Sequence, residues 1–198
     1  MSFKSLIIIV MSGILVNNYT LRQFLGICPF LGVSKELKNA TGMSIAVIFV
    51  MLLATAVTWP IQMLLLTPNG MGYLQTVVFI LVIAALVQLV ETIIKKYMPP
   101  LYNALGVYLP LITTNCAVLA VTIANIDKQY TFVEALFNAL GSGLGFMLAM
   151  VLFSGVRAHT ENSEPPASFK GLPITLVSAA ILSLSFFGFN GIVEKLFG

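Results

Sequence analysis

Charged side chains are scarce in this 198-residue chain. Only 9% of its residues are Asp, Glu, Lys or Arg, whereas soluble domains carry about 25%. Hydrophobic residues make up 59%, and a water-soluble fold of this length would need far more polar surface. The few basic residues form no patch with interleaved aromatics, which argues against nucleic-acid binding. The composition therefore predicts an integral membrane protein with a single domain over residues 1–198.

Residue types common in enzyme active sites are also rare, with one His and two Cys in the chain. No Ser/His/Asp set, Walker phosphate loop or pair of catalytic carboxylates is apparent in the sequence. His159, Glu161 and Glu164 share a hydrophilic stretch that contains no cysteine, so they make no metal motif. We expect a solvated loop there, and we expect the chain to catalyse no bond chemistry alone.

Hydropathy divides the chain into six apolar segments separated by turn residues. A membrane-spanning helix needs about 20 apolar residues, and each segment is long enough. The start of the chain is apolar, but no small-residue cleavage site follows, so we expect it to be retained as the first helix. The segments cover 4–33, 41–66, 73–96, 101–126, 132–156 and 171–196.

The distribution of Lys and Arg between the loops predicts the orientation. Cytoplasmic loops carry an excess of these residues, which here favours both termini outside. In that orientation the inside loops hold Lys35, Lys38, Lys95, Lys96, Arg157 and Lys170, and the outside holds Lys4, Lys128 and Lys195.

The first and fourth segments are interrupted by polar residues. Asn17, Asn18, Arg22 and Gln23 interrupt 4–33, whereas Gly106, Pro110 and Thr113-Thr114-Asn115 interrupt 101–126. We expect both helices to be broken at mid-membrane, with ordinary proline kinks as the alternative. Each irregular segment comes first in a set of three, and an odd number of spans reverses the second set. The pattern predicts an all-α protein of six transmembrane helices in two inverted three-helix repeats, 1–98 and 99–198.

Each of these two segments contains one cysteine, Cys28 or Cys116, away from the loops. Three interpretations remain open from the residues alone. The cysteines are small buried hydrophobes, they form a disulfide, or they are half of an iron–sulfur site that a partner completes. One cluster usually takes four cysteines, and this chain has two. Composition and spacing favour buried, inert cysteines.

Other residues within the apolar segments have simpler explanations. Arg22 balances the charge of a cluster, binds a carbonyl group, or extends to the membrane interface. Glu91 precedes Lys95 by one helical turn, which favours an ion pair between them. Gly141–Gly145 reads Gly-Ser-Gly-Leu-Gly, but no strand precedes it. We therefore expect close helix packing there and no nucleotide-binding loop.

Four stretches resemble a known family. Around the cysteines they are LVNNYTLRQFLGICPFLGVSK at Leu15–Lys35 and PLYNALGVYLPLITTNCAV at Pro100–Val118. FILVIAALVQLVE at Phe79–Glu91 and GSGLGF from Gly141 follow the same pattern. Together they resemble the A-type membrane component of the Rnf complexes, the ferredoxin:NAD oxidoreductases of bacteria and some archaea. The E-type component of the sodium-translocating NADH:quinone oxidoreductase is a close relative, and Pro29 and Thr113-Thr114-Asn115 favour the Rnf type. The stretch 160–169 matches the family less clearly.

The resemblance implies a specific role for the cysteines. In the family, the A-type component pairs with a homologous E-type component of opposite topology, and each contributes two cysteines to one [2Fe–2S] cluster near mid-membrane. Carried over, Cys28 and Cys116 are the metal ligands in this chain. The implied complex, with further components of types B, C, D and G, lies in the bacterial or archaeal cytoplasmic membrane. It moves electrons across that membrane and couples their flow to Na⁺ or H⁺ export.

Three functions therefore remain open. The first is a redox component, with the quinone-reducing relative as its near alternative. The second is a secondary ion transporter that uses an inverted repeat and has inert cysteines. The third is a structural scaffold without a cofactor.

Overall fold

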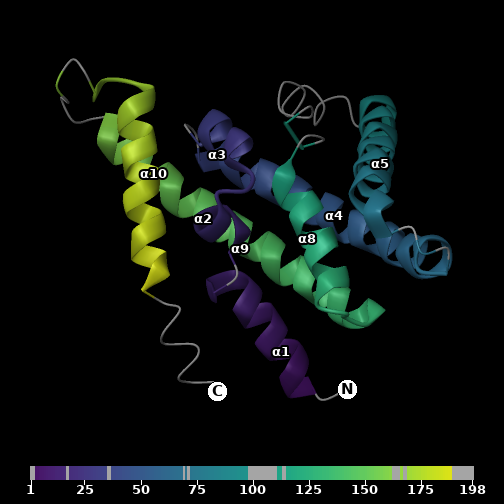
Figure 1. The fold of residues 1–198 in the computed structure, drawn as a ribbon. Helices are drawn as coiled ribbons and strands as arrows, with labels where there is room; N and C mark the ends of the chain where they lie inside the picture. The colour runs from purple at the N-terminus through teal and green to yellow at the C-terminus, as the bar shows by residue number, and fades with distance from the viewer. Residues whose placement is uncertain are drawn as a thin grey trace.

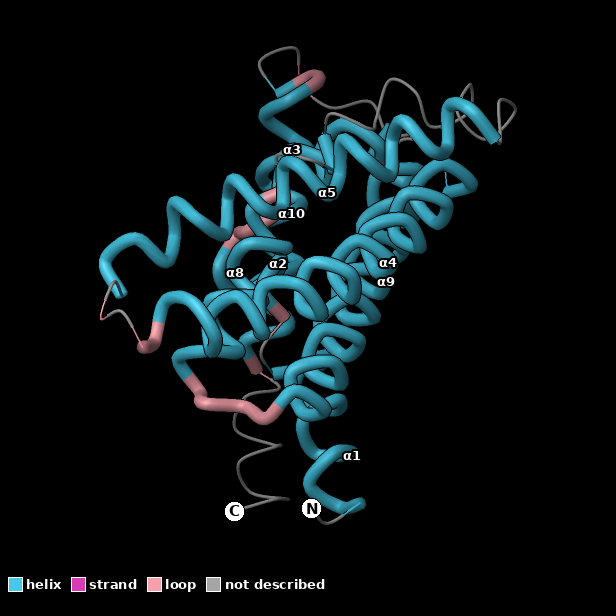
Figure 2. Tube along the Cα trace, turned by 90° about the vertical axis from the view of Figure 1, so that its right-hand side faces the viewer, coloured by secondary structure: helices cyan, strands magenta, loops and turns pink. Residues whose placement is uncertain are grey.

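The computed structural model describes residues 3–16, 18–34, 37–68, 70, 72–97, 111–112, 115–161, 166 and 169–188. Every regular element in these ranges is helical, and they contain no strand (Figure 2). The elements are α1 Phe3–Met11, η1 Ser12–Val16, α2 Tyr19–Gln23, α3 Ile27–Val33, α4 Leu37–Ile61, η2 Gln62–Leu66, η3 Gly72–Leu74, α5 Gln75–Tyr97, α8 Cys116–Asp127, α9 Phe132–Glu161 and α10 Leu172–Phe187.

Three helical stretches are long and apolar enough to cross a membrane. They are Leu37–Leu66, Gly72–Ile93 and Phe132–Thr160, and they correspond to the predicted segments 41–66, 73–96 and 132–156. Shorter apolar helices, Lys4–Leu15, Cys116–Asp127 and Leu172–Phe187, lie in the other three segments. The all-helical prediction is confirmed for the described residues, whereas six spans in two inverted repeats remain a prediction.

The first apolar segment is broken into short pieces. A π-helical turn, η1, follows α1, and Asn18 then adopts an extended backbone and begins α2. Phe24 and Gly26 have positive φ values of 55° and 83°, and α3 begins after them. The predicted interruption of this segment is therefore confirmed.

The fourth segment is described only in part. Asn115 has an extended backbone and caps α8, so a helix begins at Cys116. The predicted contributions of Gly106, Pro110 and Thr113-Thr114 lie outside the described residues.

The two longest helices, α4 and α9, pack against each other as the centre of the fold (Figures 1 and 2). At one end, the Trp59 indole N–H donates to the Tyr130 carbonyl at 3.0 Å, and the Trp59 and Phe132 rings are 5.4 Å apart. Further along, Gly143 meets Ile48, where an added Cβ would lie 2.8 Å from Ile48 Cγ1. These contacts show that α4 and α9 are antiparallel.

The glycines of α9 allow α1 and η1 to approach. A Cβ at Gly141 would lie 2.8 Å from the Val10 carbonyl oxygen, and one at Gly145 would lie 2.8 Å from the Gly13 carbonyl oxygen. Real Cβ atoms do not approach other atoms that closely, so only glycine fits at both positions. The predicted close packing of this stretch is confirmed.

Helix α9 extends further than the sequence indicates. It ends at Glu161, so Arg157 and His159 are helical, although a loop was predicted there. That prediction was wrong because it took the first charged residues as the end of the helix. No proline or glycine interrupts the chain between Arg157 and Glu161, so the helix continues past its apolar part.

Many large apolar side chains remain exposed, as expected where lipid or another protein chain covers the surface. Examples on three helices are Ile45 and Phe49 of α4, Ile80 and Leu81 of α5, and Ile181 and Leu184 of α10.

Candidate functional site

Both cysteines lie at the beginning of a helix. Cys28 is the second residue of α3, after Gly26, which caps the helix in a left-handed conformation without a side-chain hydrogen bond. Cys116 is the first residue of α8, and the Asn115 side chain caps that helix. The first backbone N–H groups of a helix have no partner within it, and they favour negative charge nearby.

The two cysteine-bearing turns adjoin each other. A Cβ placed on Gly26 would lie 2.9 Å from Asn115 Oδ1 and 3.3 Å from Ala117 Cβ. Gly26 immediately precedes α3, and Asn115 immediately precedes Cys116. The fold therefore brings together two cysteine-containing turns that are far apart in the sequence.

Asn115 lies between these turns and is only 4% exposed. Its Oδ1 accepts a hydrogen bond from the Ala117 backbone N–H at 3.0 Å, which caps α8. Its Nδ2 is buried and has no hydrogen-bond partner. Leaving a buried donor without an acceptor is unfavourable by about 1–3 kcal/mol, so this donor suits an acceptor bound beside it.

Cys28 and Cys116 are both exposed, and neither forms a disulfide. The sequence predicted both to be buried, and that prediction was wrong. An apolar segment of a soluble protein buries its small residues in its own core. In a membrane protein, lipid or a neighbouring chain can cover the same residues, so they remain on the surface of the single chain.

The candidate metal ligands at these two turns are the thiols of Cys28 and Cys116. Among the described residues, no group of three or more His, Cys, Asp and Glu side chains could hold a metal ion. Two thiols on adjoining turns fit half of a four-thiolate iron–sulfur site, because soft sulfur ligands suit iron–sulfur clusters. The exposure of both thiols leaves room for ligands from another chain.

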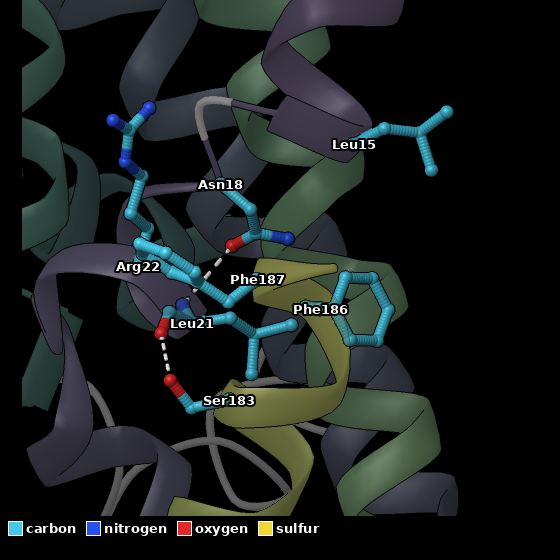
Figure 3. A pocket seen from close by; sticks show the side chains of 7 residues that line it. All are labelled: Leu15, Asn18, Leu21, Arg22, Ser183, Phe186 and Phe187. Atoms are coloured by element: carbon cyan, nitrogen blue, oxygen red, sulfur yellow. Dashed lines mark hydrogen bonds between the residues drawn. The ribbon is translucent and has the colours of Figure 1, made fainter. Parts of the chain in front are cut away.

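Asn18 fastens the broken first segment to α9 and is 2% exposed. Its Nδ2 donates to the Gly145 carbonyl at 2.8 Å. Its Oδ1 accepts from the backbone N–H groups of Thr20 and Leu21, at 3.1 Å and 3.4 Å. Figure 3 shows this contact to Leu21, whose carbonyl also accepts a hydrogen bond from Ser183 of α10. The sequence identified Asn18 as an interruption, but not as a link between elements.

Arg22 lies on α2 and is exposed, beside a small pocket lined by Asn18, Ser183 and Phe186. Its side chain is turned away from Ser183 (Figure 3). The pKa of Lys128, in the loop before α9, is lowered mainly by burial and further by the Arg22 charge. Arg22 therefore lies within electrostatic reach of that loop, and its predicted role beside a cluster remains a prediction.

Glu91 is partly buried on α5, and Lys95 is exposed one turn later. This spacing follows the predicted geometry, and the ion pair itself remains a prediction.

Arg157 makes a polar contact to the site that the sequence did not indicate. Its Nη1 donates to the Leu31 carbonyl at 2.7 Å and to Ser34 Oγ at 2.9 Å. Both acceptors lie at the end of α3, the helix that carries Cys28. The sequence signal was weak, because an arginine at the end of an apolar segment also serves as an orientation signal.

Comparison with known proteins identifies the family of this chain. Residues 6–193 match the family described as "Rnf-Nqr subunit, membrane protein". The chain is 57% identical over 187 residues to the A subunit of the Na⁺-translocating ferredoxin:NAD⁺ oxidoreductase complex of Acetobacterium woodii, covering 94% of this chain and 97% of that one. It is 52% identical over 190 residues to the A subunit of the ion-translocating oxidoreductase complex of Syntrophotalea carbinolica, covering 96% and 98%. The chain therefore belongs to the Rnf-Nqr family of membrane protein subunits.

Proposed function

We propose that this chain is the A-type membrane subunit of an ion-translocating ferredoxin:NAD⁺ oxidoreductase. In this proposal Cys28 and Cys116 are two of the four ligands of an intramembrane [2Fe–2S] cluster. A homologous E-type subunit of opposite topology supplies the other two. The complex, with B, C, D and G subunits, lies in the cytoplasmic membrane and couples electron transfer to Na⁺ or H⁺ export.

The observation that carries the proposal is the meeting of the two cysteine-bearing turns. Gly26 and Asn115 are in direct contact, and the cysteines that follow them are both exposed. Two exposed cysteines at adjoining helix starts suit ligation shared with another chain. The names of the relatives support the same assignment, because those proteins are A subunits of ion-translocating oxidoreductase complexes.

The position along α9 supports a cluster at mid-membrane. A Cβ on Gly26 would lie 3.4 Å from Phe146 Cε2, and Phe146 lies near the middle of α9, Phe132–Glu161. Almost all of α9 belongs to a stretch long enough to cross the membrane. A group held beside Gly26 would therefore be far from either aqueous surface.

The residues of this chain would hold such a group and compensate part of its charge. When bound, an iron–sulfur cluster accepts and donates one electron at a time. The thiolates of Cys28 and Cys116 bind iron, and their charge is costly in lipid unless donors compensate for it. The unpartnered Nδ2 of Asn115 is a donor next to Cys116, and N–H donors near cluster sulfurs adjust the reduction potential.

The proposal is tested by Cys28→Ser and Cys116→Ser in the complete complex. We expect each variant to insert and assemble but to lose the [2Fe–2S] signal in EPR spectra, together with the matching iron. Ala180→Ser, at an exposed position on α10, is the control for adding a hydroxyl group. An unchanged cluster signal in either cysteine variant would reject the ligand assignment.

A further inference from the structure

We infer that Arg157 is a positioning residue for Cys28, because its guanidinium fastens the end of the short helix that carries this cysteine. The inference rests on the proposed function for its redox consequence. Its geometric part depends only on the contacts of Arg157.

Helix α3 is too short to be stable without contacts to other elements. It has seven residues, and isolated helices shorter than about 12 residues are marginal even in favourable sequences. Its first residues receive no hydrogen bond from a capping side chain, because the N-cap residue, Gly26, has no side chain. Along the helix, Pro29 and Val33 are buried while Cys28 and Gly32 are exposed, so α3 lies at the surface of the fold. The direction of Cys28 therefore depends on what holds α3 in place.

Arg157 supplies such a contact from near the end of α9. It lies on α9, which packs along α4, and its guanidinium donates to the Leu31 carbonyl and to Ser34 Oγ. The last carbonyls of a helix have no partner within it, and Leu31 is among the last residues of α3. Hydrogen bonds from a charged donor are about twice as strong as neutral ones. Both hydrogen bonds come from the same nitrogen, Nη1, so one donor atom on α9 holds Leu31 and Ser34 at the end of α3.

The positive charge has a second consequence. Leu31 is three residues after Cys28, so the guanidinium contacts the same short helix as the thiolate. A fixed positive charge near a cluster stabilises its reduced form, because reduction adds a negative charge. Arg157 therefore orients Cys28 and also favours reduction of the cluster that Cys28 would bind.

Three substitutions separate the hydrogen bonds from the charge. Arg157→Gln removes the charge and shortens the side chain, Arg157→Lys keeps a charged donor on a slightly shorter side chain, and Ser34→Ala removes one acceptor while keeping the charge. Lys170→Gln is the matched control, because it removes an exposed positive charge from the loop that follows α9.

The first measurement does not need a cluster. In a Cys116→Ser background, Cys28 of the full chain in isolated membranes is labelled with a maleimide. We expect Arg157→Gln to change the labelling rate by about tenfold, the factor that corresponds to ~1.4 kcal/mol, with smaller changes in Ser34→Ala and Arg157→Lys. Lys170→Gln should label like its parent. Equal rates in Arg157→Gln and Lys170→Gln would overturn the inference.

The second measurement is an EPR redox titration of the intact complex. We expect a more negative midpoint potential in Arg157→Gln, with Arg157→Lys restoring most of the shift and Lys170→Gln showing none. A wild-type complex without any cluster signal would reject the proposed function, and the labelling experiment would still decide the role of Arg157. A wild-type potential in Arg157→Gln would overturn the redox part of the inference.

Discussion

At the scale of the residue, Gly26 occupies a position that a side chain would disturb in two ways. Its φ of 83° lies in the left-handed region, which is unfavourable by roughly 1–2 kcal/mol for a residue with a Cβ. The added Cβ would also lie 2.9 Å from Asn115 Oδ1, which caps the helix of Cys116. A single methyl group at Gly26 would therefore disturb both cysteine-bearing turns.

We predict that Gly26→Ala lowers the iron content of the purified complex and its thermal midpoint. Gly32→Ala is the matched control on the same helix, because a Cβ there meets only Leu111 Cδ1, at an ordinary 3.7 Å. Gly32→Ala should be neutral or slightly stabilising, since alanine is the better helix former. If the two variants show equal iron content and equal midpoints, the contact between the turns is unimportant.

Asn18 allows a second test at the same scale, because its two amide atoms have separate roles. Asn18→Ala removes the cap of α2 and the hydrogen bond to the Gly145 carbonyl. We predict a loss of about 2 kcal/mol or more, because a lost cap and an orphaned buried acceptor each contribute about 1 kcal/mol. The readout is the thermal unfolding midpoint of the complex in detergent.

Asn18→Asp separates these two roles. Its carboxylate still accepts from Thr20 and Leu21 but places an oxygen against the Gly145 carbonyl. If the link to α9 matters more than the cap, Asn18→Asp is destabilised as strongly as Asn18→Ala. A stability close to wild type in Asn18→Asp would assign the main role of Asn18 to the cap.

At the scale of the element, hydropathy predicted the long helices well. Length and apolar composition define a spanning helix, so α4, α5 and α9 were found near their observed positions. The polar residues Asn17 and Asn18 indicated the break in the first segment. Asn115 was likewise expected to interrupt the fourth segment, and in the structure it lies directly before α8, where asparagine is favoured as a cap.

The sequence did not predict the contacts between elements. The adjoining turns of Gly26 and Asn115 follow from how α2, α8 and α9 pack, which no local pattern records. The two hydrogen bonds of Arg157 were missed for the same reason. One acceptor is the backbone carbonyl of Leu31, and any residue type at that position has a backbone carbonyl. Cysteine exposure was mispredicted because hydropathy does not distinguish a core from a surface covered by lipid or another chain.

The glycine-containing face of α9 gives a prediction at this scale. Gly141→Ala and Gly145→Ala would each place a Cβ 2.8 Å from a backbone carbonyl oxygen of the first segment. A backbone carbonyl cannot move out of a steric clash as a flexible side chain can, so α1 and η1 must move away from α9. We predict reduced accumulation of the protein in membranes and a lower thermal midpoint for both variants.

Gly155→Ala is the control for this prediction, because it lies on the same helix and a Cβ there has no neighbour within 4 Å. It should match or slightly exceed wild-type stability. Equal behaviour of Gly141→Ala and Gly155→Ala would show that α1 is not packed against α9 in the membrane.

At the scale of the whole molecule, contacts at the two ends of α4 and α9 group the loop residues as the charge pattern does, and which end faces the cytoplasm remains a prediction. Arg157 and Ser34 are hydrogen-bonded to each other, and the charge pattern predicts both on the inside. Trp59 and Tyr130 meet at the opposite end of α4 and α9, near the loop with Lys128, which is predicted outside. The residues predicted inside and the residues predicted outside therefore lie at opposite ends of the α4–α9 pair.

This orientation gives the last prediction. Tyr73, after α4, and Lys170, after α9, are both exposed, with Tyr73 at 81%, and the charge pattern predicts Tyr73 outside and Lys170 inside. In intact spheroplasts, a membrane-impermeant maleimide should label Tyr73→Cys at once and Lys170→Cys only after permeabilisation. The wild-type chain, with its two native cysteines, measures background labelling.

Each other outcome of this labelling has a definite meaning. Labelling of Lys170→Cys alone before permeabilisation would reverse the orientation. Labelling of both would place the α4–α5 and α9–α10 loops on one side of the membrane. That result is incompatible with the predicted six spans, because three of them separate these loops, and loops separated by an odd number of spans must face opposite sides.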